Sequence, residues 1–305
     1  MNNAIKDNFG RYVKNLRISI TSRCNLNCVY CHREGNTGAR KEMTADEMAK
    51  ITGICAPFGI NKVKITGGEP TIRQDLTEII EKISGIPGIE EVSMTTNATF
   101  DTDWSMLREA GLRRVNISLD TLDKNKYSTL ICSGFPIEKV MSNIKSARRV
   151  FEVVKLNMVV MKGVNENEID GMIEFSKNNG IVLQLIELID SDKEFFNKYF
   201  YGLSGIEKEF DEKATQIIQR KFMQNRKKYV IRGAEVEIVH PMHNTGFCKN
   251  CTRMRITSDG KFKPCLMRNN NLIDFLTPMR AGAGDDELKK LFLEAVKKRK
   301  PYFCE

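Results

Sequence analysis

The sequence lacks the features that mark membrane, secreted and disulfide-stapled proteins. No apolar run is long enough to cross a bilayer, and no leader-like apolar segment stands near the N-terminus. The nine cysteines are an odd number, which argues against a framework of disulfides. There is no low-complexity segment and no internal repeat beyond an alternation of strand-like and helix-like stretches. We therefore expect a cytoplasmic protein without a membrane partner, in which clustered thiols bind metal or take part in catalysis.

The composition allows a large folded core and suits an anionic ligand. With 305 residues, 41% of them hydrophobic, the chain can form one large domain or a domain with an appendage. The formal net charge of +9 is spread along the sequence. This charge suits an anionic ligand, with nucleic acid as one candidate, but a solvated basic surface would carry the same charge without a ligand.

Strand-like and helix-like stretches alternate up to about residue 190. Apolar and β-branched runs predict strands near 15–21, 61–66, 91–96, 114–120, 154–161 and 182–189. Helical periodicity predicts helices near 44–56, 75–85, 102–110, 137–150 and 166–178, the first of which begins with a capping box of Thr44 and Glu47. Parallel strands need such crossover helices, so the pattern predicts a parallel α/β fold, either a barrel or a doubly wound sheet.

The pattern changes after residue 190. Residues 191–205 are mixed aromatic and polar and predict a connecting loop or lid, and residues 206–223 predict a helix with one apolar face. Two hairpins are expected next, one around Gly233 and one turning at residues 258–260. A helix near 285–299 is the last expected element.

Three cysteines stand within "CNLNCVYC", directly after the first predicted strand: Cys24, Cys28 and Cys31. A loop of this length can turn all three sulfurs toward one centre. A structural zinc site would need a fourth ligand, and His32 is adjacent to Cys31 but poorly placed to share its metal. A four-iron cluster with three cysteine ligands instead keeps one iron free for an exogenous molecule.

A second set has the spacing C-x2-C-x13-C and consists of Cys248, Cys251 and Cys265. Taken alone, it could be a zinc knuckle completed by His240 or His243. Two incomplete sets in one chain favour iron-sulfur clusters, since each cluster would keep a free iron. The remaining cysteines have no such spacing, and Cys55 is expected in the core.

These residues resemble the signature of a known enzyme superfamily. The C-x3-C-x2-C loop, with Tyr30 before its third cysteine, resembles the radical S-adenosylmethionine motif, and "TGGEP" at 66–70 resembles that superfamily's second motif. With "KITGGEPTIRQDL", "NISLDTLD", "VKLNMVVMKGVNE" and "FCKNCTRMRITSDGKFKPCL", nearly the whole chain resembles the GTP 3′,8-cyclase family of molybdenum cofactor biosynthesis. "HREG" stands where many bacterial members have a methionine–proline run, which suggests an archaeal type.

The resemblance implies a fold, two cofactors and a reaction. It implies a partial (β/α)6 barrel, similar to a TIM barrel, over residues 1–225, and a C-terminal extension of hairpins and a helix over residues 226–305. The first cysteine set would hold a 4Fe-4S cluster whose free iron binds S-adenosylmethionine, and the second set would hold a 4Fe-4S cluster that orients guanine. In this family a 5′-deoxyadenosyl radical takes hydrogen from the ribose 3′ carbon of GTP. That carbon then attacks C8, and the product of this lyase is 3′,8-cyclo-7,8-dihydro-GTP.

The residues at matching positions divide into two groups. Adenosylmethionine contacts are expected at Tyr30, Gly68, Glu69, Ser118 and Ile189. GTP contacts are expected at Arg17, Lys62, Lys64, Thr95, Lys155, Arg253, Met254 and Arg255, with Arg17 also the candidate catalytic residue. A triphosphate demands convergent cations, and inward cations in a barrel need an anionic partner. A lone lysine on a strand is otherwise a surface residue, Ser118 could instead cap a strand end, and Arg73 could be a structural partner of Glu69.

Three positions depart from the family pattern. Lys64 stands where many members have arginine, which keeps the charge but loses the fork geometry, and Ile189 stands where many have methionine. The chain ends in "KRKPYFCE", where many members have a Gly-Gly tail thought to reach into the active site. Either another segment replaces that tail or the substrate differs.

The resemblance also implies partners and leaves two alternatives. It implies an electron donor of flavodoxin or ferredoxin type and a downstream cyclic pyranopterin monophosphate synthase, implies no nucleic acid, and leaves a homodimer open. One alternative is a radical adenosylmethionine enzyme with an auxiliary cluster acting on a peptide or another small molecule. The other is a non-catalytic iron-sulfur electron carrier or a zinc-knuckle nucleic-acid binder. "GGEP" argues against the carrier or knuckle, and the arginine pair in "CTRMRIT" favours GTP over a peptide.

Overall fold

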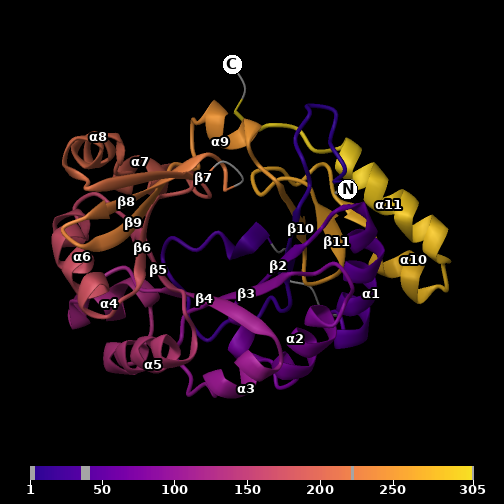
Figure 1. Ribbon diagram of the computed structural model, residues 1–305, viewed down its shortest axis with the longest axis horizontal. Helices are drawn as coiled ribbons and strands as arrows, with labels where there is room; N and C mark the ends of the chain where they lie inside the picture. The colour runs from indigo at the N-terminus through magenta and orange to yellow at the C-terminus, as the bar shows by residue number, and fades with distance from the viewer. Residues whose placement is uncertain (1–3, 36–41, 221–222, 304–305) are drawn as a thin grey trace.

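One curved sheet of twelve strands organises the computed structural model, which describes residues 4–35, 42–220 and 223–303 (Figure 1). Its first six strands in the chain lie side by side in sequence order and run parallel. They are β1 (Asn15–Ser19), β2 (Lys62–Thr66), β3 (Glu91–Thr96), β4 (Leu112–Ser118), β5 (Val154–Val160) and β6 (Val182–Glu187). All six predicted strands are therefore confirmed.

Helices connect these strands and lie outside the curve of the sheet (Figure 1). They are α1 (Ala45–Cys55), α2 (Leu76–Ser84), α3 (Trp104–Glu109), α4 (Lys124–Ile131), α5 (Ile137–Val150) and α6 (Ile169–Asn178). The capping box is confirmed, because Thr44 Oγ1 accepts from the Glu47 N–H at 3.2 Å and Glu47 Oε2 accepts from the Thr44 N–H at 2.9 Å. The sequence does not predict α4.

The C-terminal residues extend the same sheet at both ends. β9 (Ala234–Val239) lies parallel to β6 and β10 (Arg253–Ile256) lies parallel to β1, so eight adjacent strands run parallel. Antiparallel strands follow on either side, namely β8 (Arg226–Ile231), β7 (Gln216–Arg220), β11 (Lys261–Lys263) and β12 (Ile273–Asp274). The predicted partial barrel is confirmed and is wider than six strands. The division into residues 1–225 and 226–305 stays a prediction, and the sheet runs across it.

The helix predicted over residues 206–223 is confirmed only in its first part, up to residue 213. α8 (Ser204–Lys213) is shorter than predicted, and β7 begins three residues after its end. Backbone pairing explains the difference, because the Thr215 N–H donates to the Val230 carbonyl at 2.8 Å and the following residues pair with β8. The hairpin partner thus overrides the local helical period. The loop predicted over residues 191–205 contains a further short helix, α7 (Lys193–Tyr199).

Both predicted hairpins and the last helix are confirmed. β8 meets β9 at Gly233 and β10 meets β11 at Gly260, whose φ angles of +80° and +74° lie in the left-handed region that glycine adopts readily. α9 (Thr245–Lys249) and α10 (Leu276–Arg280) are short, and α11 (Asp285–Lys297) packs the Phe292 ring against Phe58 and Phe262. Cys55 lies in the core as predicted. In the part of the chain that the structure describes, no helix is long and apolar enough to cross a membrane.

His240, a candidate ligand for the zinc knuckle, is held by two carboxylates instead. Its Nδ1 lies 2.8 Å from Glu187 Oε1, and its Nε2 lies 3.0 Å from Glu207 Oε2. Burial would lower the pKa of the imidazole, but the hydrogen bonds and charges of Glu187 and Glu207 outweigh burial and raise the pKa to about 9. Both ring nitrogens are occupied, so His240 does not complete the second cysteine set.

We expect the stabilising contribution of His240 to be lost as the pH rises above neutrality. The pKa of His240 is raised in the folded chain, so its contribution is fully present below about pH 6.5 and is lost as the pH rises through about 9. The free energy of unfolding should fall by on the order of 2 kcal/mol across this window in anaerobic urea titrations. His240→Gln should be less stable at pH 6.5 and show a flatter profile, and an equally steep profile in the variant would contradict the assignment.

Candidate active site

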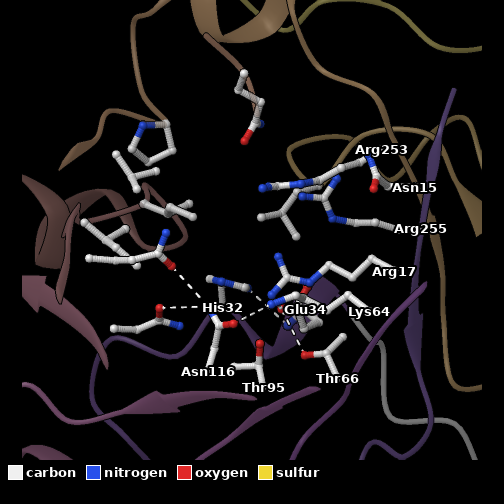
Figure 2. A pocket seen from close by; sticks show the side chains of 18 of the residues that line it. Asn15, Arg17, His32, Glu34, Lys64, Thr66, Thr95, Asn116, Arg253 and Arg255 are labelled. Carbon is white, nitrogen blue, oxygen red and sulfur yellow. Dashed lines mark hydrogen bonds and ion pairs between the residues drawn. The ribbon is translucent and has the colours of Figure 1, made fainter. Parts of the chain in front are cut away.

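A cavity of about 390 Å³ runs along the inner face of the parallel strands (Figure 2). Both cysteine sets line it, as do Lys62 near the start of one strand and Ser118 at the end of another. The other predicted contacts that line it are Arg17, Tyr30, Lys64, Gly68, Glu69, Thr95, Lys155, Ile189, Arg253 and Arg255. The fold therefore gathers residues that stand more than 200 positions apart in the sequence into one cavity.

Met254 is the predicted GTP contact that does not line the cavity. Its side chain is fully buried in the hydrophobic core. Side chains alternate along a strand, so Arg253 and Arg255 face the cavity while Met254 between them faces the other way. A contact from Met254 to a ligand in the cavity is thus limited to its backbone.

The first cysteine loop and the "GGEP" segment dock on each other through their backbones. The Gly68 N–H donates to the Thr21 carbonyl at 2.8 Å, and the Glu69 N–H donates to the Arg23 carbonyl at 2.9 Å. A Cβ on Gly68 would lie 2.0 Å from the Arg23 carbonyl oxygen and 3.0 Å from the Cys24 nitrogen. Any other residue at position 68 would therefore push the two segments apart. Because β1 and β2 are parallel neighbours, the two motifs follow strand ends at the same edge of the sheet.

The Glu69 carboxylate is fixed from several sides. Its Oε1 accepts from the Thr71 N–H at 3.0 Å and the Thr96 hydroxyl at 2.6 Å, and its Oε2 accepts from the Asn97 N–H at 2.7 Å. Burial raises the pKa of Glu69, and these hydrogen bonds oppose that rise. The alternative pairing of Arg73 with Glu69 is wrong, because the Arg73 guanidinium binds the Asp75 carboxylate instead.

Tyr30, which belongs to the first cysteine loop, is fixed by a hydrogen bond to Asp120. Its hydroxyl donates to Asp120, whose other oxygen accepts from the Val159 N–H at 2.7 Å. Burial raises the pKa of Asp120 to about 6. The Tyr30 side chain is thereby held on the wall that it shares with Ser118 and with Ile189, two residues beyond the end of β6.

The first cysteine set has the donors and spacing of a cluster site. The thiols lie close enough for their charges to interact, and burial raises the pKa of each. In the described part of the chain, no three cysteine, histidine or carboxylate side chains gather as they would around a single metal ion. A four-iron cluster would bind each of the three sulfurs through a separate iron. Bound iron would itself ionise the thiols.

The second cysteine set lies where the two ends of the chain meet. Arg11 Nη1 donates to the Cys248 carbonyl at 3.0 Å, and Arg299 Nη2 donates to the Cys251 carbonyl at 2.5 Å. Burial would raise the pKa of the Cys251 thiol, but the charges of Arg299, Arg253 and another arginine outweigh burial and lower the pKa. The thiolate is the form that binds metal, so these arginines favour the metal-binding form of Cys251.

The last described residues also reach the cavity. Lys300, Tyr302 and Phe303 line it, and the Phe303 ring packs on His243 with the ring centroids 4.8 Å apart. Cys304 lies outside the described residues.

Cations occupy one row across three adjacent strands. The strand register aligns Arg255 with Arg17 and Arg17 with Lys64, and all three side chains face the cavity (Figure 2). Like charges directly opposite each other destabilise a sheet. Burial and the nearby charges of Arg114, Arg17 and other cations lower the pKa of Lys64 well below its usual range. The row is therefore a site that an anion would stabilise.

The other predicted cations differ in how far the chain already neutralises them. Lys155 forms a buried ion pair with Glu237 at 2.5 Å, and Lys62 lies 3.5 Å from Glu91. Among the described residues, no carboxylate forms an ion pair with Lys64, Arg253 or Arg255. Arg253 and Arg255 also lie near the second cysteine set, and burial and the charge of Arg17 lower the pKa of Arg253. The free positive charge is therefore concentrated on the β10 side of the cavity.

Sequence reasoning missed many polar residues of the cavity, among them Glu34, Gln224 and Arg226. Glu34, in the "HREG" segment, reaches Arg17, and its acidic side chain in a run after the cysteines is the signal that could have found it. Gln224 lies in the turn between β7 and β8 and Arg226 is the first residue of β8, and the sequence predicted no strand before this turn. Gln224 is buried and its Oε1 has no hydrogen-bond partner, so it offers an acceptor to a ligand.

Comparisons with known proteins show the family of this chain. The family model described as the radical SAM superfamily matches residues 18–176, and that described as Molybdenum Cofactor Synthesis C matches residues 181–304. A probable GTP 3′,8-cyclase of Methanothermobacter thermautotrophicus is 45% identical over 98% of this chain and 99% of its own length. One from Pyrococcus abyssi is 48% identical over 97% of this chain and 99% of its own length.

Solved structures share the fold at low sequence identity. Streptococcus suis SuiB bound to the precursor peptide SuiA matches with a TM-score of 0.66 and 19% identity, covering 99% of this chain and 73% of SuiB. The enzyme anSMEcpe with bound AdoMet matches with a TM-score of 0.58 and 19% identity, covering 83% of this chain and 74% of that one. At such identities the likeness extends to the fold alone.

Proposed function

We propose residue roles for a chain that belongs to the radical S-adenosylmethionine superfamily and, within it, to the GTP 3′,8-cyclases of molybdenum cofactor biosynthesis. The enzyme binds a 4Fe-4S cluster and S-adenosylmethionine and converts GTP to 3′,8-cyclo-7,8-dihydro-GTP. In our proposal, adenosylmethionine lies against the first cysteine loop and "GGEP". GTP lies beside it, with its triphosphate on the row of Arg255, Arg17 and Lys64.

The row of three cations carries this proposal. A sheet does not gain stability by placing like charges opposite each other inside a cavity, so the arrangement calls for an anion. A triphosphate supplies several negative charges and many acceptor oxygens, which matches three converging donors. Lys155, already paired with Glu237, would contact the substrate without bearing most of its charge. Thr95 would be a neutral contact, since its hydroxyl is buried there without a partner.

The first cluster site and its neighbours would hold and orient adenosylmethionine. Cys24, Cys28 and Cys31 would ligate the cluster, which when bound supplies the electron that releases a 5′-deoxyadenosyl radical from adenosylmethionine. The Gly68 backbone and the fixed Glu69 carboxylate would meet the amino group of the methionyl part. Tyr30, Ser118 and Ile189 would contact the adenosyl part. The enclosing strands would exclude water, so that the radical meets only the intended hydrogen.

We place a second 4Fe-4S cluster on Cys248, Cys251 and Cys265. Its support is the lowered pKa of the Cys251 thiol and the buried Arg299, which donates to the Cys251 carbonyl. Guanine would lie against this cluster, because Arg253 and Arg255 follow Cys251 directly and would hold the triphosphate of the same nucleotide. Arg17, at the centre of the cation row, would be the catalytic residue nearest the reacting ribose.

Two partners follow from this proposal. A flavodoxin- or ferredoxin-type donor would supply electrons, and the net charge of +9 suits the acidic surface of such a protein. The product would pass to a cyclic pyranopterin monophosphate synthase.

Anaerobic turnover tests the proposed function. Reconstituted protein with reductant, adenosylmethionine and GTP should form 5′-deoxyadenosine and a cyclised nucleotide in about equal amounts, and ATP should give no cyclised product. Liquid chromatography with mass spectrometry measures both products. Zinc alone at both cysteine sets, or adenosylmethionine cleavage that is indifferent to GTP, would refute the proposal.

A further inference from the structure

A carboxylate of the chain already occupies the cation row. Glu34 Oε1 lies 2.8 Å from Arg17 Nη2 and accepts from the Thr66 hydroxyl at 3.3 Å (Figure 2). The other carboxylate oxygen, Oε2, is buried and has no hydrogen-bond partner. Glu34 thus lies in the middle of the proposed triphosphate site with half of its hydrogen-bonding capacity unused.

Charge, rather than apolar packing, holds Glu34 in this place. Burial would raise the pKa of its carboxyl, but the charges of Arg17 and His32 outweigh burial and lower the pKa to about 2. Glu34 is therefore ionised at neutral pH. Its negative charge neutralises part of the positive charge of the cation row.

The backbone that brings Glu34 into the cavity is strained. Arg33 and Glu34 have φ angles of +49° and +50°, so two adjacent residues with side chains are in the left-handed region. Such residues persist only where surrounding interactions impose the conformation. The ion pair with Arg17 is one such interaction, beside the hydrogen bond from the Glu34 N–H to His32 Nδ1 at 3.1 Å. Loss of the pair would remove one of the interactions that impose this conformation.

We propose that Glu34 is an internal occupant of the triphosphate site, which a phosphate group of the substrate must displace from Arg17. This inference rests on the proposed function, because it takes the cation row as the triphosphate site. A phosphate group carries more charge and more acceptor oxygens than a carboxylate, so it replaces Glu34 favourably. Displacement also releases the strain at Arg33 and Glu34.

The exchange gives the site a basis for selecting nucleotides. A ligand without phosphates cannot replace the carboxylate at Arg17 and leaves the site closed, whereas a triphosphate opens it. The moving segment begins two residues after Cys31, a proposed cluster ligand. Binding of the correct nucleotide would therefore affect the conformation of the loop that holds the first cluster.

Calorimetry on the anaerobically reconstituted enzyme tests the exchange, with GTP, inorganic triphosphate and guanosine as ligands. A site that is open in only a fraction of free molecules has its apparent affinity reduced by that fraction, and removing the internal competitor restores the full affinity. If the site is open in about a tenth of free molecules, Glu34→Gln should bind GTP and triphosphate about tenfold more tightly. Guanosine binding should not change. Glu34→Asp, whose carboxylate is too short to reach Arg17 fully, should shift affinity in the same direction and decides the question if Glu34→Gln does not fold.

Two controls separate displacement from a general charge effect. Glu91→Gln removes the same charge from the cavity but leaves the Arg17–Glu34 pair intact, so its gain in affinity should fall well short of that of Glu34→Gln. In an Arg17→Ala background, Glu34→Gln should no longer tighten binding, because the contact that it relieves is absent.

The outcomes also separate this proposal from the proposed function. Weaker or unchanged triphosphate binding in Glu34→Gln, with normal GTP binding in the unmodified enzyme, would overturn the exchange and leave the triphosphate site standing. Failure of the unmodified enzyme and both Glu34 variants to bind GTP at all would overturn the proposed function.

Discussion

Arg255→Ala is expected to weaken GTP binding by about 100-fold while adenosylmethionine cleavage without GTP stays within about twofold of the unmodified enzyme. Arg255 is largely buried, its Nε has no hydrogen-bond partner, and in the described chain no carboxylate forms an ion pair with it. Its Nε–H is therefore available to the triphosphate. Anaerobic calorimetry measures the affinity, and chromatography of 5′-deoxyadenosine measures the cleavage.

Stability distinguishes this binding role from a structural one. Removing one member of the row Arg255–Arg17–Lys64 relieves like-charge repulsion, so Arg255→Ala should unfold no more easily than the unmodified chain in the absence of GTP. Arg255→Lys should lose part of the affinity, because it keeps the charge but not the fork. Arg113→Ala, on an exposed side chain of β4, is the matched control and should bind GTP normally. Loss of fold and affinity together in Arg255→Ala would show that the residue is structural.

Replacing either cysteine set by serine is expected to remove half of the iron with different consequences. The unmodified chain should hold about eight irons, four for each cluster, and each triple variant should keep about four. Changing Cys24, Cys28 and Cys31 should abolish adenosylmethionine cleavage altogether. Changing Cys248, Cys251 and Cys265 should leave cleavage in place but abolish the cyclised nucleotide, because the base is no longer oriented.

Iron analysis, Mössbauer spectra and product analysis measure these effects. Cys55→Ser and Cys132→Ser, which change a core and an exposed cysteine with no predicted role in either set, should keep about eight irons and are the controls. The placement of the second cluster would be contradicted if the variant of Cys248, Cys251 and Cys265 kept its full iron content. Equal loss of cleavage in both triple variants would contradict the division of roles.

Where local sequence periods are strong, they predicted the fold well. The six parallel strands and the helices α1, α2, α5 and α6 follow from apolar spacing because each buries one face against the same core. The period failed at β7, where pairing with β8 outweighed a helical pattern. Strand pairing depends on a partner elsewhere in the chain, so a pattern within a short stretch of sequence cannot reveal it.

The candidate site divides in the same way between motif and geometry. The spacing of the cysteines and "TGGEP" predicted which residues meet, since parallel neighbours bring their ends to one edge of the sheet. Met254 was placed among the GTP contacts with the arginines on either side of it, and the alternation of side chains along β10 turned its side chain into the core. The sequence allows a pairing of Glu69 with Arg73, but the Arg73 guanidinium binds the Asp75 carboxylate instead.

The sequence by itself determined the chemistry of this protein, namely two incomplete cysteine sets, the adenosylmethionine motifs and a surplus of cations. Those are properties of residue type and close spacing, which the order of the chain carries directly. Only the tertiary structure decided that Arg255, Arg17 and Lys64 form one row, because the register between β10, β1 and β2 joins residues far apart in the chain. It also decided that Glu34 lies against that row, because a strained turn after the cysteine loop brings its carboxylate within 2.8 Å of Arg17.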